Sequence, residues 1–228
     1  MTQASPRDGQ PIHQNQNDES PFNLQQLRRN LPSWLQRFIP SGGGQHEDHH
    51  GKGMFGMTIF LLSESMIFVS FFASYIVLRL TTTDWLPSGV SGPEASPTVI
   101  FHSAVLVSSS FVLYFAERSL KRHQLTRFRL LWLLTSAMGI YFLIGEVQEW
   151  AGLDFGLTTG IGGGTFYVLT GFHGLHVATG ILLQFIMLGR SLLPNNYEHG
   201  HFGVSAASLF WHFVDVLWLI LFSLLYLW

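Results

Sequence analysis

Long apolar segments alternate with short polar links from residue 54 to the end of the chain. Five apolar segments run from Met54 to Leu80, Thr98 to Ala116, Phe128 to Trp150, Thr165 to Leu188 and Phe202 to Trp228. As helices rising about 1.5 Å per residue, all five are long enough to cross a hydrocarbon layer of about 30 Å. None shows the two-residue alternation of a membrane β-strand. The pattern therefore predicts an all-α polytopic membrane helix bundle with five transmembrane helices.

Composition agrees with a membrane protein. Of the 228 residues, 47% are hydrophobic and only 11% are charged, whereas an ordinary soluble domain has about 25% charged residues. The net charge of -2 gives no reason to expect a nucleic-acid partner. Cysteine is absent, which excludes disulfides, thiolate metal sites and a cysteine nucleophile.

The first 50 residues differ from the rest because they are polar and rich in Gln, Asn, Asp, Pro and His. We expect a largely disordered cytoplasmic tail here. Within it, the leucines of residues 22–39 recur at helical spacing beside arginines, so a short helix on the membrane surface is an alternative to disorder. Pro32 prevents one continuous helix. Residues 51–228 form the predicted transmembrane domain.

The basic residues predict the orientation in the membrane. If the N-terminus is cytoplasmic, only Arg79 of the twelve basic residues lies outside. The other eleven lie in the tail, in the link after the second segment and in the link after the fourth. The opposite topology would reverse this count, so we predict a cytoplasmic N-terminus and an outside C-terminus.

Glu64 is the single carboxylate inside the first apolar segment, about 15 Å from Met54 along a helix. A carboxyl group at this depth needs a partner or is neutral. We expect a hydrogen bond to a polar group on a neighbouring helix, with His173 and His176 as candidates. A structural hydrogen bond and a role in proton handling or lipid contact both fit this position.

His173 and His176 are three residues apart in the fourth segment and so share one helical face. Gly171, Gly174 and Gly180 flank them, and we expect these glycines to let another helix approach closely. Two such histidines could ligate a metal or haem, but no glutamate or third histidine at ligand spacing accompanies them. We favour interhelical hydrogen bonding and predict neither a metal site nor a catalytic residue.

Two further ionisable pairs have the same three-residue spacing. In the fifth segment, Asp215 follows His212, and a carboxylate beside an imidazole can hold its tautomer. A catalytic dyad would also require a nucleophile nearby. Glu146 and Glu149 lie near the end of the third segment, where they can reach water.

Several motifs together resemble subunit III of the haem-copper terminal oxidases. They are Gly171-Phe-His-Gly-Leu-His176, Trp211-His-Phe-Val-Asp215-Val-Leu-Trp218, the Glu64 segment from Gly56 to Phe68, and Gly145-Glu-Val-Gln-Glu149. They occur in the family's order within about residues 54–228. The chain resembles the five-helix bacterial form, because the mitochondrial form has two more helices at its start.

The resemblance implies an accessory subunit of an aa3-type cytochrome c oxidase in a bacterial inner membrane or an internal respiratory membrane. Subunit I would be the main partner, subunit II would belong to the same complex, and haem a and copper would reside in those partners. It further implies stabilisation of subunit I, support of proton uptake and contact with phospholipid. Subunit III of a quinol oxidase is one alternative. A free-standing transporter or proton channel is another, although such proteins often show inverted repeats and broken helices.

Overall fold

The computed structural model describes residues 48–192 and 202–228. Five α-helices occupy these residues: α2 (Asp48–Thr81), α3 (Pro97–Lys121), α4 (Leu125–Gly152), α5 (Gly160–Ser191) and α6 (Phe202–Tyr226). All five are long and apolar enough to cross a membrane, and the described part of the chain contains no strand. The predicted all-α polytopic bundle is confirmed. The predicted surface helix at 22–39 lies outside the described residues.

Local sequence signals set several helix ends. Ser96 caps α3, where its hydroxyl accepts a hydrogen bond from Val99 N at 3.3 Å, and Pro97 follows in the first turn. After α3, His123 adopts a positive φ of 58°, which turns the chain into α4. At the start of α5, Gly160 has a φ of 71°, a conformation that glycine adopts without strain.

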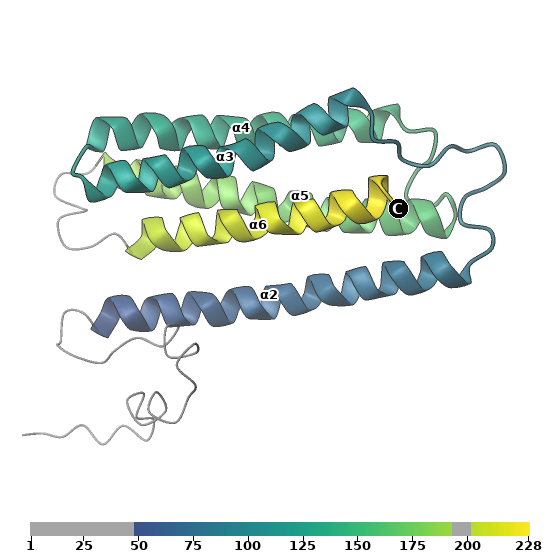
Figure 1. Ribbon diagram of the computed structural model, residues 1–228, viewed down its shortest axis with the longest axis horizontal. Helices are drawn as coiled ribbons and strands as arrows, with labels where there is room; N and C mark the ends of the chain where they lie inside the picture. The colour runs from purple at the N-terminus through teal and green to yellow at the C-terminus, as the bar shows by residue number, and fades with distance from the viewer. Residues whose placement is uncertain (1–47, 193–201) are drawn as a thin grey trace, which may run out of the picture. The chain divides into compact units, whose positions relative to one another are not determined.

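The helices α3 to α6 form a closed ring (Figure 1). Close backbone approach joins α3 to α4, α4 to α5, α5 to α6, and α6 back to α3. Three fully buried tryptophans, Trp132, Trp211 and Trp218, are the largest side chains in this core. The outward faces of the helices carry many exposed large apolar side chains, as expected where lipid or another membrane protein surrounds them.

Helix α2 contacts this ring through side chains. Phe68 packs against Phe172 of α5 with ring centroids 5.3 Å apart. The hydroxyl of Tyr75 donates to the backbone oxygen of Leu224 in α6 at 3.1 Å. These contacts place one face of α2 against α5 and α6.

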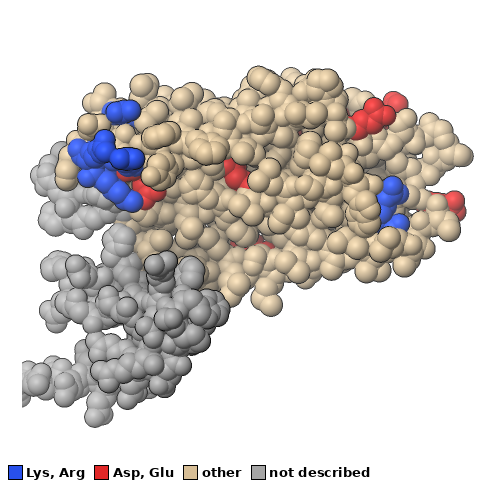
Figure 2. Space-filling model, in the orientation of Figure 1, with Lys and Arg blue, Asp and Glu red and all other residues tan. Residues whose placement is uncertain are grey.

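Lys and Arg side chains lie near the ends of the helices in Figure 2. The basic group at the junction of α3 and α4 contains Arg118, Lys121, Arg122 and Arg127. Of the other two described links, the one after α2 holds no basic residue and the one before α5 holds none either. This asymmetry agrees with the charge pattern used for orientation, and the side of the membrane remains a prediction.

Candidate functional site

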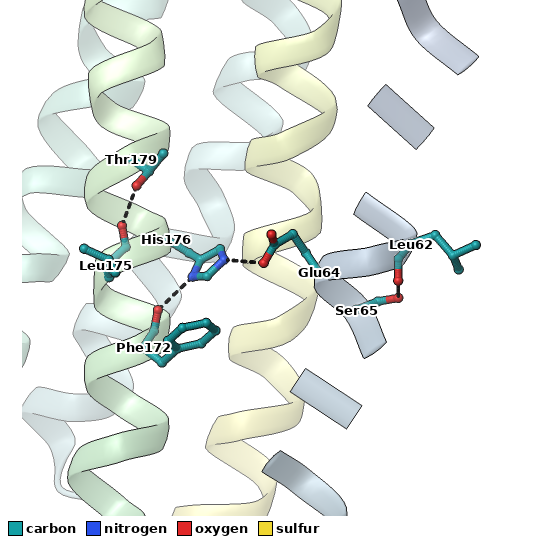
Figure 3. A network of polar contacts seen from close by, with 7 residues as sticks. All are labelled: Leu62, Glu64, Ser65, Phe172, Leu175, His176 and Thr179. Carbon is teal, nitrogen blue, oxygen red and sulfur yellow. Dashed lines mark hydrogen bonds and ion pairs between the residues drawn. The ribbon is translucent and has the colours of Figure 1, made fainter. Parts of the chain in front are cut away.

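Glu64 and His176 form a partly buried polar pair between α2 and α5 (Figure 3). The Oε2 atom of Glu64 lies 3.1 Å from Nε2 of His176. The side chains are only 20% and 10% exposed, respectively. Of the two candidate histidines, the structure selects His176, and the interhelical hydrogen bond predicted for Glu64 is present.

The second ring nitrogen of His176 also lies near a hydrogen-bond acceptor. Its Nδ1 atom lies 2.8 Å from the backbone oxygen of Phe172. A carbonyl oxygen only accepts, so Nδ1 donates to Phe172 in the tautomer that carries its proton on Nδ1. In the other tautomer, Nε2 carries the proton and donates to the carboxylate of Glu64. The imidazole therefore lies between an acceptor on its own helix and a carboxyl group on α2.

Aromatic rings surround the imidazole of His176. Phe68 presents an edge-on contact to His176 with centroids 5.0 Å apart, and Phe172 lies 4.8 Å away. Phe210 of α6 stacks on the same ring at 6.2 Å. These apolar rings limit the water available to the imidazole, and a hydrogen bond is stronger in such surroundings than in water.

His173 faces elsewhere, and the interhelical hydrogen bond predicted for it is wrong. Its ring is fully buried, and neither ring nitrogen has a hydrogen-bond partner among the described residues. It stacks on Trp218 of α6 at 5.0 Å and meets the ring of Phe142 of α4 at 6.1 Å. Two side chains three residues apart on a helix point about 60° away from each other around the axis. This difference allows His173 to contact α4 and α6 while His176 contacts α2.

His212 and Asp215 are joined through a third residue. The hydroxyl of Ser110 in α3 donates to Oδ2 of Asp215, and Nδ1 of His212 lies 2.9 Å from the same hydroxyl oxygen. Since the serine proton is used toward Asp215, the imidazole donates to the serine oxygen. The expected direct support of His212 by Asp215 is therefore replaced by a serine bridge between α3 and α6.

The sequence interpretation missed Glu117 in α3. Its carboxylate accepts from Ser205 at 3.2 Å and Ser208 at 3.3 Å, both in α6, and pairs with Lys121 at 3.0 Å. The i, i+4 spacing to Lys121 was a usable signal. Its contacts to α6 could not be read from the sequence, because they depend on how α3 and α6 are aligned.

Glu146 and Glu149 have different surroundings although they share a helix. Glu149 accepts a hydrogen bond from the hydroxyl of Tyr226 at 2.7 Å. Glu146 is only 5% exposed, and neither carboxyl oxygen has a partner among the described residues. The expected access to water near the helix end thus does not hold for Glu146.

The three glycines singled out on α5 lie against different groups. A Cβ atom on Gly180 would come within 2.8 Å of the Trp211 ring, so this glycine permits a close approach of α6. At Gly174 the nearest atom would be an oxygen of Glu146 at 3.2 Å, and at Gly171 the Trp150 ring would be at 3.5 Å, an ordinary contact. Gly171 therefore does not require glycine on steric grounds.

Within residues 48–192 and 202–228, no three His, Asp or Glu side chains converge as a metal site would require. The arrangement instead offers separate polar contacts between helices. Among them are Glu64 with His176, the Ser110 bridge, Glu117 with two serines of α6, and Glu149 with Tyr226. Their chemistry is hydrogen bonding between helices.

Such a bundle defines the class as an all-α, multi-pass membrane protein with internal polar contacts. The family described as Cytochrome c oxidase subunit III matches residues 20–228. Cytochrome c oxidase subunit 3 of Synechocystis sp. is 40% identical over 209 residues, which cover 91% of this chain and 88% of that protein. The chain belongs to the cytochrome c oxidase subunit III family.

Two further relatives carry the same name. The protein of Thermostichus vulcanus is 41% identical over 181 residues, covering 79% of this chain and 89% of its own length. The protein of Mus musculus is 34% identical over 195 residues, which cover 81% of this chain and 75% of that protein. Family membership makes this chain part of an oxidase complex, and these names do not favour the quinol-oxidase alternative.

Proposed function

We propose that this chain is an accessory subunit of a proton-pumping, aa3-type cytochrome c oxidase, that it stabilises subunit I and supports proton uptake, and that it carries no redox centre itself. Family membership over residues 20–228 is the observation that carries the proposal. Haem a and copper belong to the partner subunits, with subunit I as the main contact and subunit II in the same complex. The membrane is a bacterial inner membrane or an internal respiratory membrane.

The internal contacts support an accessory role over a free-standing channel. Glu64 is bonded to His176, and Asp215 is bonded to Ser110. A transport pathway needs ionisable groups that face a continuous aqueous route, whereas these groups face other helices. Their function in this proposal is to hold the bundle in one arrangement.

The apolar outer surface supports docking to a larger membrane protein or to lipid. Exposed side chains of α2 include Leu62 at 63% and Met66 at 68%. Packing in a membrane depends on shape and on a few polar contacts, so an apolar face of this kind serves a permanent membrane partner as well as phospholipid acyl chains.

Isolation of the full chain in mild detergent from its own membrane tests the proposal. We expect haem a absorbance and copper to co-purify with the chain in a constant ratio. Removal of this chain from the purified complex should leave both cofactors with the remaining subunits and shorten the period of active turnover. A chain that purifies without any haem-containing partner would contradict the proposal, and proton flux by the chain alone in liposomes would favour the channel alternative.

A further inference from the structure

Three side chains between α4 and α5 have every polar side-chain atom buried and unbonded within the described residues. They are Glu146, Trp150 and His173. The other side chains with such atoms are different, because Arg129, Gln184 and Asp215 each use another polar atom in a hydrogen bond. Among the residues that the structure describes, the side chains whose polar atoms are all buried and unbonded therefore lie in one region of the bundle.

The packing shows that these three groups are close along the helices. Gly174 of α5 lies against the carboxyl group of Glu146, with an oxygen 3.2 Å from the position a Cβ would take. Gly171 lies against the Trp150 ring, one helical turn away, at 3.5 Å. His173 falls between these two glycines in the sequence, and its ring meets Phe142, one turn before Glu146. The register of the two helices therefore places the three groups within about one helical turn of one another along the interface.

A partner subunit cannot reach these polar atoms to form hydrogen bonds with them, because they are buried within this chain. Glu146 is 5% exposed and His173 is fully buried within this chain alone. A buried polar group without a hydrogen bond costs about 1–3 kcal/mol on mutational scales, and an unpaired buried charge costs more. In native protein interiors, such groups form hydrogen bonds with an ordered water molecule when two to four polar atoms surround its position. The chemistry here is suitable, because a carboxyl, an imidazole and an indole together supply both donors and acceptors.

We propose that Glu146, Trp150 and His173 form an internal water-binding site between α4 and α5, in which Glu146 is a neutral carboxylic acid. As a neutral acid, Glu146 donates a hydrogen bond through its O–H to the water, and the water donates a hydrogen bond to the unprotonated ring nitrogen of a neutral His173. The indole N–H of Trp150 donates to the same cluster. Gly174 leaves the space that the carboxyl occupies, so a larger residue there would displace it.

The first test is a high-resolution cryo-EM map of whatever complex the full chain purifies in. We expect density for at least one water within hydrogen-bond distance of both the Glu146 carboxyl and a ring nitrogen of His173. A direct bond between the two side chains, or two unbonded side chains with no density between them, would overturn the proposal. This outcome does not depend on whether the complex is an oxidase, which is judged separately by its haem and copper.

The second test measures the carboxylic acid by infrared difference spectroscopy of the same complex. Glu146→Gln should remove one carboxylic acid C=O band that shifts in D₂O, and the matched control Glu149→Gln should keep it. His173→Phe retains a ring between Trp218 and Phe142, and it should move the band to higher frequency because the shared water is lost. A band that survives Glu146→Gln refutes the neutral acid, and a band unmoved by His173→Phe refutes the shared site. If a variant does not assemble, the map of the unmodified complex decides.

Discussion

The packing around Trp211 can be tested directly, because α4 and α5 each contact its ring at a glycine. A Cβ on Gly139 of α4 would come within 2.5 Å of the ring, and one on Gly180 of α5 within 2.8 Å. The indole is fully buried, and its Nε1 donates to Ser109 at 2.8 Å. The ring is thus fixed on two sides by backbone and at its edge by a hydrogen bond.

Gly139→Ala places a methyl group where the Trp211 ring packs against α4. An ordinary Cβ contact begins near 3.4 Å, so the ring must move by about 0.9 Å or α4 must move away from it. Overpacking of this kind costs about 1–3 kcal/mol. For a chain of this size, each kcal/mol corresponds to about 2–4 °C of melting temperature, so we expect a decrease of roughly 2–12 °C.

The control must carry the same change in helix propensity, since alanine is favoured over glycine in a helix by about 1 kcal/mol. Gly56→Ala and Gly189→Ala meet this requirement, because no atom lies within 4 Å of either Cβ position. The assay is thermal unfolding of the purified complex, followed by tryptophan fluorescence. If Gly139→Ala has the same melting temperature as the two controls, then the indole has room to move and the tight packing inferred from the geometry is incorrect.

Three further predictions concern the polar contacts and the topology. Glu64→Gln should leave assembly intact and shorten the active lifetime of the complex, because the amide can form a hydrogen bond but cannot take up or release a proton; the exposed loop control Glu94→Gln should match the wild type, and a wild-type lifetime for both variants would leave Glu64 only structural. His212→Leu should lower stability by about 0.5–1.5 kcal/mol because Ser110 loses a hydrogen-bond donor, and an unchanged melting temperature would count against this. Gln124→Cys, in a chain without native cysteine, should react with an impermeant maleimide only from the cytoplasmic side; labelling from outside would reverse the predicted orientation.

The apolar runs predicted all five helices. They did not predict where each helix begins, because helix starts depend on capping residues and on tertiary contacts. The second segment was expected from Thr98, and α3 begins at Pro97 because Ser96 caps it. The fourth was expected from Thr165, whereas α5 begins at Gly160. Hydropathy is weak in this glycine-rich stretch, and the helix start is held instead by Gly162 N donating to the backbone oxygen of Trp85 at 2.9 Å. That contact is tertiary, so no local pattern could predict it.

The candidate site was predictable in its residue types and not in its pairings. Burial of Glu64 in an apolar run required a polar partner, which the structure supplies as His176. Choosing His176 over His173 depends on the rotation of α5 about its axis. The same rotation leaves His173 beside Trp218. Spacing identifies a shared face, but the direction of that face is set by the packing of whole helices.

The attachment of α2 explains why one polar pair matters for the whole bundle. No close backbone approach joins α2 to another described helix. Its inner face is a stripe at helical spacing that runs from Glu64 through Phe68 to Tyr75. Aromatic contacts tolerate sliding and rotation, since rings attract over several geometries. Hydrogen bonds are directional, and Glu64 and Tyr75 make them about 16 Å apart along α2. Two directional bonds at that separation define both the rotation and the height of α2, which the rings alone would leave variable.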